Sequence, residues 1–427
     1  MSKSINNPSG FGLYSAWIGL LSVLVIMGGY VALLTFTQGL SIMKVSFQIP
    51  WTLSIAVYVF LAVTSTGLCI ISSFGNLGIS YGSVIGFKHW EVAGEGRVGR
   101  TCVLLAILTL LAAFIVIGLH LGRVDRMPSQ LTLSPNLHSA MWWMGTLYGL
   151  YLIFICCEFW YLIRRDTAAK ALQVEGGLKK FYRLLTLGNH ETSEESYHRD
   201  HKRARLFGTL ALIAGVSAHA TLGALFAHLD AKVLWYGAFY PVFFILSAVF
   251  SGIAWLSLIT YFTFKLEGRT MGERMEGIFI ALGRIMAFLL AVCLLFIGFK
   301  MASALGSPEK LQAAALLLNG PFSTNFWLFE ITIGLLIPII LLTMPGLRDR
   351  LGTLAIASVC VIIGVFVMRF DMVTAGQVFP AGVFLDSYMP LLPEIILTIG
   401  VFALVLLAYT LAAKYLPLQE TLRVKRS

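Results

Sequence analysis

Long apolar runs dominate the chain, and polar residues gather between them. Ten runs reach the roughly 20 residues that a helix needs to cross a hydrocarbon core. Strands are not expected, because the runs lack strict alternation and are about twice as long as membrane-barrel strands. The pattern predicts an all-α polytopic membrane protein, one integral membrane domain over residues 1–427, with spans at 13–36, 50–74, 101–121, 139–163, 206–229, 235–264, 279–302, 325–344, 351–369 and 392–414.

Composition supports a membrane protein. Of the 427 residues, 58% are hydrophobic and 12% charged, whereas a soluble domain is about 45–50% apolar and about 25% charged. The formal net charge is +10. Because the basic residues lie in the connections between spans, they indicate orientation in a lipid bilayer, and nucleic-acid binding is not expected.

The basic residues are unevenly divided between the two sides. The termini and even-numbered connections hold about 23 of the 31 Lys and Arg, ten of them in 164–205, and the odd-numbered connections about five. The positive-inside rule then places both termini in the cytoplasm, in the inner membrane if the source is bacterial. The first run lacks a basic n-region and a cleavage site, so a retained helix is expected. Within 164–205, GGLKKFYRLL fits either a basic amphipathic helix on the anionic leaflet or a solvated linker.

Two of the runs resemble each other. Spans two and six each have an entry tryptophan and a glycine about 16–17 residues later, namely Trp51 with Gly67 and Trp235 with Gly252. Unless this likeness is chance, it predicts a parallel repeat of two four-helix bundles, at about 50–229 and about 235–369, with the first and last helices flanking them.

The connection 120–143, HLGRVDRMPSQLTLSPNLHSAMWW, concentrates polar groups at the membrane boundary. His120 ends span three and His138 precedes span four, so both imidazoles can approach one pocket. An imidazole can exchange a proton with a quinone oxygen near neutral pH, and Trp142 and Trp143 offer an aromatic wall. The alternative is an interfacial belt with snorkelling arginines.

Ionisable side chains also fall inside the spans, where they are costly and therefore candidates for function. His219 in span five is a ligand contact, a hydrogen-bonded core histidine or a haem ligand. Glu158 in span four and Arg284 in span seven fit a proton relay or structural ion pairs. Four acidic or basic residues near the ends of spans eight to ten predict an ion-pair cluster, with a second binding site as the alternative: Glu330, Arg369, Asp371 and Glu394.

Metal ligation is weakly supported. The six cysteines lie in apolar runs without a C-x-x-C pair, so no iron–sulfur or zinc site is expected in this chain. Haem b remains open, because four histidines lie on the membrane side: His120, His138, His219 and His228.

Several segments together resemble the NrfD/polysulfide-reductase membrane-subunit family, over roughly residues 10–417. They are PWTLSIAVYVFLAVTSTG, HLGRVDRMP followed by SPNLHSAMWW, SAHATLGALFAHLDAKVLWYGAFYPVFFILSAVFSGIA, FWLFEITIGLLIPIILL, GVFVMRFDMV and YMPLLPEI. The likeness is greatest to the ten-helix branch with the membrane subunits of hydrogenase, alternative complex III and quinone-reductase complexes. Two positions depart from the family's DLGRP signature, which has Asp where this chain has His120 and Pro where it has Val124.

The resemblance implies a haem-free membrane subunit that exchanges electrons between menaquinone or ubiquinone and a periplasmic iron–sulfur, ferredoxin-like partner. A multihaem cytochrome c, molybdopterin or hydrogenase subunit would complete the complex, and proton translocation is a further expectation. The implied quinone site is His120, Arg123, His138, Ser139, Trp142 and His219, with His120, His138 or Asp125 as proton acceptor. The expected proton pathway comprises Glu158, His219 and Arg284.

Two other classes of function stay open. A secondary transporter suits the repeat and the buried charges, although no matched pair of Gly/Pro-broken helices is visible. A haem b cytochrome would be revealed by the visible spectrum of the purified chain.

Overall fold

Ten long helices make up most of the molecule. The computed structural model describes residues 8–43, 45–76, 97–127, 129, 133–378 and 388–418. Within these ranges ten helices are long and apolar enough to cross a membrane, and no strand occurs. The all-α, ten-span prediction is confirmed. The long helices are α1 (Pro8–Gln38), α2 (Leu53–Asn76), α4 (Arg97–His120), α6 (Ala140–Gln173), α8 (Glu194–Ala227), α9 (Phe239–Leu266), α10 (Glu273–Ala304), η4 (Asn325–Leu336) continued by α12 (Ile337–Thr343), α13 (Leu351–Val378) and α14 (Leu392–Tyr415).

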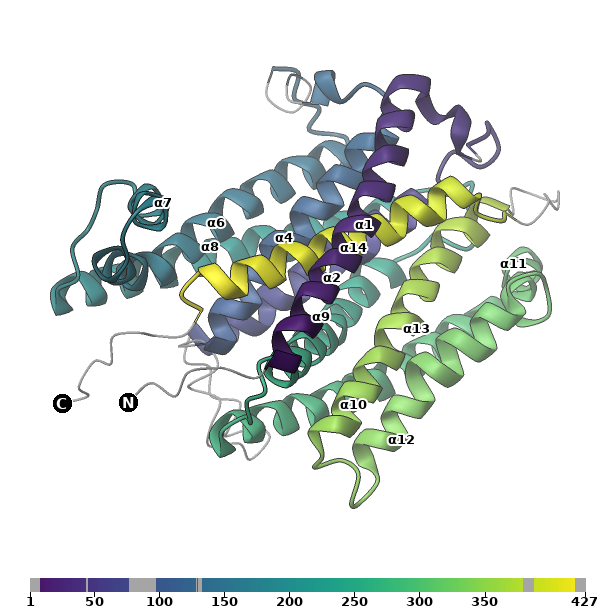
Figure 1. Ribbon diagram of the computed structural model, residues 1–427. Helices are drawn as coiled ribbons and strands as arrows, with labels where there is room; N and C mark the ends of the chain where they lie inside the picture. Colours follow the sequence, from purple (N-terminus) through teal and green to yellow (C-terminus); the bar gives the residue numbers. More distant parts are fainter. Residues whose placement is uncertain are drawn as a thin grey trace.

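The helices form two groups of four (Figure 1). In the first bundle α2 packs on α4 and α8, and α6 packs on α4 and α8. In the second, α13 packs on α9 and on η4 with α12, and α10 packs on α9 and α12. Helices α1 and α14 pack on each other and cross the outer side of α4 and α2. Short helices η1 (Gly39–Ile42), η3 (Val124–Arg126), α7 (Gly177–Leu185) and α11 (Pro308–Leu318) lie in the connections.

The two bundles meet where α2 crosses α9. A Cβ on Gly67 would lie 1.8 Å from the Ala248 carbonyl oxygen, and a Cβ on Gly252 would lie 2.6 Å from the Gly67 carbonyl carbon. Near one end of this contact the Trp51 and Trp235 rings stack with centroids 5.3 Å apart. Each of these residues therefore meets its counterpart in the sequence repeat.

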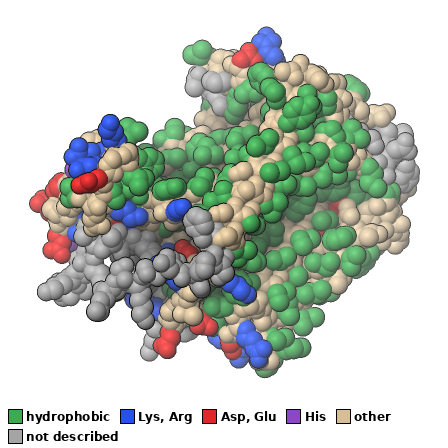
Figure 2. Space-filling view, in the orientation of Figure 1, with side chains coloured by type: hydrophobic (Ala, Val, Ile, Leu, Met, Phe, Trp, Pro, Cys, Tyr) green, Lys and Arg blue, Asp and Glu red, His purple; other side chains and the backbone are tan. Residues whose placement is uncertain are grey.

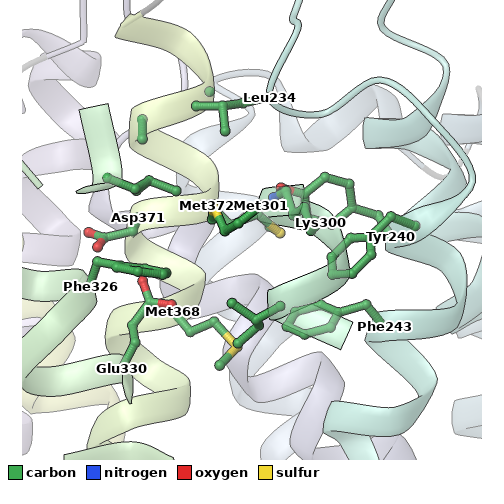
Figure 3. A pocket seen from close by; sticks show the side chains of 15 residues that line it. Leu234, Tyr240, Phe243, Lys300, Met301, Phe326, Glu330, Met368, Asp371 and Met372 are labelled. Atoms are coloured by element: carbon green, nitrogen blue, oxygen red, sulfur yellow. The ribbon is translucent and has the colours of Figure 1, made fainter. Parts of the chain in front are cut away.

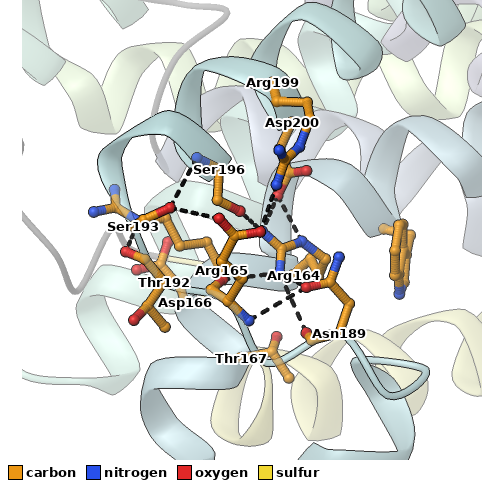
Figure 4. A network of polar contacts seen from close by, with 12 residues as sticks. Arg164, Arg165, Asp166, Thr167, Asn189, Thr192, Ser193, Ser196, Arg199 and Asp200 are labelled. Carbon is orange, nitrogen blue, oxygen red and sulfur yellow. Dashed lines mark hydrogen bonds and ion pairs between the residues drawn. The ribbon is translucent and has the colours of Figure 1, made fainter.

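Helices α6 and α8 extend beyond the predicted ends at 163 and 206. Arg164 has no exposed side-chain surface. Its Nε donates to Asp200 Oδ2 at 2.6 Å, and its Nη1 donates to Asn189 Oδ1 at 2.9 Å (Figure 4). A second buried pair joins Arg100 and Asp166 at 2.7 Å. The sequence predicted a long connection over 164–205. In the structure α6 continues to Gln173 and α8 begins at Glu194, because buried ion pairs allow these charged segments to remain helical.

The GGLKKFYRLL segment forms helix α7 (Gly177–Leu185). Of the two interpretations, a helix and a solvated linker, the helix is therefore confirmed. The Tyr182 hydroxyl donates to the Tyr415 carbonyl at 2.7 Å, and the Trp160 indole donates to the Leu185 carbonyl at 2.8 Å. Leu178 and Leu184 remain exposed, so contact between α7 and lipid stays a prediction.

The outer surface matches a multi-pass membrane protein. Figure 2 shows hydrophobic side chains over a broad area of the visible face, with charged side chains gathered toward its ends. Such a surface is soluble in lipid rather than in water.

Candidate functional site

His120 ends α4 beside the start of α2. Its Nε2 lies 3.0 Å from the Pro50 carbonyl oxygen. A carbonyl only accepts, so Nε2 carries the proton and Nδ1 is left as an acceptor. Nδ1 is buried and has no hydrogen-bond partner among the described residues. The half-buried ring therefore presents a free lone pair within the protein.

The first turn of α2 is held by side chains from distant helices. The first amides of a helix lack intrahelical partners. The Leu53 amide donates to the Tyr388 hydroxyl at 3.0 Å, and Tyr388 in turn donates to Glu394. The Trp51 amide donates to Gln377 Oε1 at 2.9 Å. Thr52 Oγ1, between these contacts, is buried without a hydrogen-bond partner in the described ranges.

Sequence reasoning missed Pro50 as the partner of His120, and it missed Gln377 and Tyr388 as the residues that hold the start of α2. One signal was available, since Gln377 is a polar residue at the end of an apolar run. Its pairing with Trp51 spans 326 residues, and no local pattern predicts a contact at that separation.

Arg123 and Asp125 form an ion pair with each other at the surface. Arg123 Nη2 lies 2.7 Å from Asp125 Oδ2, and the two side chains are 63% and 61% exposed. The hydrogen bond from Arg123 lowers the pKa of Asp125 to about 2. A carboxylate of that acidity is a weak base at neutral pH, so this geometry does not favour Asp125 as the proton acceptor.

His138, Ser139 and Trp142 lie around the start of α6. Ser139 caps the helix, and its hydroxyl accepts from the Trp142 amide at 3.3 Å. The Trp142 and Trp143 rings meet edge to face at 4.9 Å. His138 is exposed, and no hydrogen bond joins its ring to that of His120 in the part of the chain that the structure describes.

His219 is completely buried in the first bundle. Its Nε2 lies 3.1 Å from the Phe244 carbonyl oxygen and its Nδ1 lies 3.0 Å from the Tyr148 hydroxyl. The carbonyl requires a proton on Nε2, so Tyr148 donates to Nδ1. Both nitrogens are engaged, which is the arrangement of a hydrogen-bonded core histidine. His219 lies eight residues before the end of α8, roughly 12 Å inside it.

Glu158 also points into the first bundle, from the inner face of α6. A Cβ on Gly208 would lie 2.8 Å from Glu158 Oε1, so the glycine makes room for the carboxyl group. On the same face, the Tyr151 hydroxyl donates to the Ser65 carbonyl at 3.0 Å. The polar residues Tyr148, Tyr151 and Glu158 recur along one buried stripe of α6.

Arg284 is placed differently. Its guanidinium lies 2.8 Å from Asp349, and the two side chains are 44% and 49% exposed. Its helix, α10, packs within the second bundle. The structure therefore does not bring Arg284 to Glu158 or His219.

The predicted ion-pair cluster at the ends of spans eight to ten is wrong. Glu394 accepts from Tyr388 and from the Leu391 amide, beside the start of α2. Arg369 forms no ion pair within the described residues. Its Nη2 donates to Ser247, and its guanidinium carbon lies 4.4 Å from the centre of the Phe244 ring. Arg369 and Asp371 are two positions apart and face different sides of α13.

Metal ligands do not gather within the described residues, where no group of three or more His, Cys, Asp or Glu side chains could hold a metal ion. The chemistry of the His120 region is that of a proton acceptor and hydroxyl groups beside a membrane surface.

Comparison with known proteins gives a consistent family. The family described as "Polysulphide reductase, NrfD" matches residues 41–381. A subunit of the selenate reductase of Mesobacillus selenatarsenatis is 26% identical, over 95% of this chain and 94% of that protein. The Hdr-like menaquinol oxidoreductase integral membrane subunit of Archaeoglobus fulgidus is 24% identical, over 94% and 92%. Protein NrfD of Escherichia coli is 24% identical, over 77% and 96%.

Proposed function

The chain belongs to the NrfD family of polysulphide reductase membrane subunits, and we propose that it is the quinone-reactive membrane subunit of an oxidoreductase complex. In this proposal menaquinol or ubiquinol is oxidised to the quinone and releases two electrons and two protons. The electrons pass to a ferredoxin-like iron–sulfur partner on the periplasmic face, and the reverse direction uses the same site. The printed name of the Archaeoglobus relative, a menaquinol oxidoreductase subunit, supports a quinol substrate.

The Nδ1 of His120, which is buried and has no hydrogen-bond partner among the residues that the structure describes, is the observation that carries the proposal. A quinol hydroxyl can donate to this nitrogen and then transfer its proton. The Pro50 carbonyl, on the opposite side of the ring, holds Nε2–H and stabilises the imidazolium that forms.

The exposed connection after His120 is suited to a partner subunit. Leu133 and Leu137 are 83% and 62% exposed there, next to Arg123 and the half-buried Trp142. Apolar side chains rimmed by charge are typical of protein interfaces. In the proposal the partner covers this connection, including His138 and Ser139, and brings its nearest redox centre close to the quinone site. A cytochrome c, molybdopterin or hydrogenase subunit would accept or supply the electrons beyond it.

The proposal includes a route for protons through the first bundle. Tyr148, His219, Tyr151 and Glu158 form a column of polar side chains inside the first bundle. This column, without Arg284, is the route we propose for protons. If Glu158→Gln left the number of protons moved per electron unchanged, that route would be excluded. The distribution of Lys and Arg supports cytoplasmic termini in a bacterial inner membrane.

A binding titration tests the quinone site. A fluorescent quinol-site inhibitor is titrated into the full-length chain, comparing wild type, His120→Ala and His138→Ala. We expect saturable binding that His120→Ala weakens at least tenfold, about 1.4 kcal/mol. His138→Ala is the matched control, because its ring is exposed. Equal weakening by both substitutions, or no saturable binding to folded wild type, would refute the assignment.

A further inference from the structure

The second bundle contains a cavity that the proposed function does not use. It lies between α9, α10, η4 and α13 and has a volume of about 40 Å³, which leaves room for a few waters. Phenylalanine and methionine form much of its wall. Lys300 and Tyr240 lie on one side of α13, with Glu330 and Asp371 on the other (Figure 3).

The side chains of Glu330 and Asp371 line the same end of this cavity, close enough for each carboxyl group to act electrostatically on the other (Figure 3). Their residues are 5% and 1% exposed. Asp371 Oδ1 accepts from Asn325 Nδ2 at 2.8 Å. Asp371 Oδ2 receives no hydrogen bond from any donor of the described residues. Two carboxylates only accept and repel each other, so this contact becomes favourable when one carboxyl group carries a proton and donates it to the other.

Charged and titratable groups from each neighbouring element face this pair without neutralising it. From α10 they are Lys300, whose Nζ lies 2.5 Å from the Tyr240 hydroxyl of α9, and Cys293. From α13 it is Arg369, whose Nε and Nη1 are buried without partners among the described residues. Across the described ranges, no ion pair within 4.0 Å joins either cation to Glu330 or Asp371. A direct salt bridge would fix both acids as carboxylates, and none does so here.

The backbone brings the acids together in an unusual way. Glu330 lies on η4, which is wound as a π-helix over Asn325–Leu336. Such turns are rare and are frequently found at functional sites. One turn further on, a Cβ on Gly364 of α13 would lie 2.2 Å from Gly334 Cα. This close backbone approach allows the short Asp371 side chain to reach Glu330.

We propose that Glu330 and Asp371 form a proton-binding site in the second bundle, in which the two carboxyl groups share one proton and exchange it through the waters of the cavity. The ligand is a proton: its release leaves two carboxylates in the cavity that Lys300 also lines, and its return restores the carboxyl–carboxylate hydrogen bond. The site goes beyond the quinone site of the first bundle and does not require it.

The site lies close to one face of the membrane. Lys300 is four residues from the end of α10, Glu330 five residues from the start of η4, and Asp371 seven residues from the end of α13. These helix ends are on the same side as the His120 connection. A proton thus has about one to two helical turns to cross between the cavity and that surface.

Infrared difference spectroscopy tests the proposal directly. The full-length chain in lipid nanodiscs is titrated with acid and base, and the C=O stretching band of protonated carboxylic acids is recorded in H₂O and D₂O. Wild type is compared with Glu330→Gln, Asp371→Asn and the double variant. We expect each single substitution to remove the same band, and the double variant to remove nothing more, because one proton is shared.

Two further variants keep the test decisive. Glu394→Gln is the matched control, since Glu394 accepts from two donors and carries no proton in this scheme, so the band should remain. Asn325→Ala removes the donor to Asp371 without removing either acid, and should shift the titration midpoint of the band to higher pH. This variant serves if the acid substitutions unfold the protein, as judged by circular dichroism.

The outcomes separate this site from the quinone site. A band that survives both single substitutions, or two bands lost independently, would overturn the shared proton. Loss of the wild-type band on adding Na⁺ at constant pH would identify a metal cation as the ligand and would also overturn it. None of these readings needs quinone, so failure of the His120 assignment would leave the result unchanged.

Discussion

The contact between α2 and α9 predicts that an alanine at Gly67 separates the two bundles. In Gly67→Ala the new Cβ would lie 1.8 Å from the Ala248 carbonyl oxygen, whereas ordinary contacts begin at about 3.4 Å. Helix α9 would have to withdraw by about 1.6 Å. The obstructing atoms are backbone, so no side chain can turn aside to make room.

The cost follows from the loss of contact along the crossing. Inserting a methyl group into a packed interior typically costs about 1–3 kcal/mol, and close packing of small residues is what holds membrane helices together. Since both surfaces are backbone, we expect the upper end of that range, about 3 kcal/mol. The assay is unfolding in mixed micelles with increasing dodecyl sulfate, followed by circular dichroism.

Gly149→Ala is the matched control, because a Cβ at that position of α6 has no atom within 4 Å. It should be neutral or stabilise by up to about 1 kcal/mol, as alanine favours helix over glycine. If Gly67→Ala unfolded at the same dodecyl sulfate fraction as Gly149→Ala, the backbone contact between the bundles would be refuted.

Three further predictions concern the polar contacts. In His120→Gln the amide replaces Nε2 and keeps the Pro50 contact but lacks the Nδ1 acceptor, so inhibitor affinity should fall by about 3- to 10-fold. His120→Asn should retain binding and lose quinol turnover by about 10²- to 10⁴-fold, because an amide accepts a hydrogen bond but no proton; equal effects of the two amides on binding would contradict the role of Nδ1. Arg164→Ala leaves its buried carboxylate partner unpaired and should destabilise by about 3–5 kcal/mol, seen as faster limited proteolysis between α6 and α8; unchanged cleavage would contradict the network. Tyr148→Phe leaves Nδ1 of His219 without a donor and should cost about 1–3 kcal/mol in the same unfolding assay, and an unchanged midpoint would show that the bond is not formed.

The number of membrane helices was predictable because each span must be apolar over about 20 residues. The ends of the helices were not. Charged residues after 163 read as the end of a span, yet Arg164 is buried and paired with Asp200. Burial of a charge depends on a partner 36 residues away, and hydropathy along the chain does not contain that information.

The contacts of the candidate site residues were not predictable from the sequence. The 120–143 connection drew attention to His120, but its partner is the Pro50 carbonyl, 70 residues earlier. The same connection suggested that His138 and Asp125 belong to the His120 site. In the structure His138 is exposed, and Asp125 forms an ion pair with Arg123 at the surface. Residues that are close together in a connection can still point in different directions. Those directions depend on where the adjoining helices end, which the sequence of the connection does not reveal.

The acidic residues near the ends of spans eight to ten show the same limit more sharply. Their depth and sign suggested ion pairs, but residues 369 and 371 are about 200° apart around a helix, so they cannot serve one partner. Applied to the sequence, this geometry separates Asp371 from Arg369 and leaves Glu330 as its neighbour. Two acids at close range are favourable only when one of them carries a proton.

Helix α13 links the two sites that the structure suggests. At its end, Gln377 holds the backbone of Trp51, next to the Pro50 carbonyl that orients His120. Two turns earlier it carries Asp371 in the second bundle, and the Met372 carbonyl accepts from the Trp235 indole that stacks on Trp51. A shift of the first turn of α2 on quinol binding would therefore be transmitted along α13 to the acid pair.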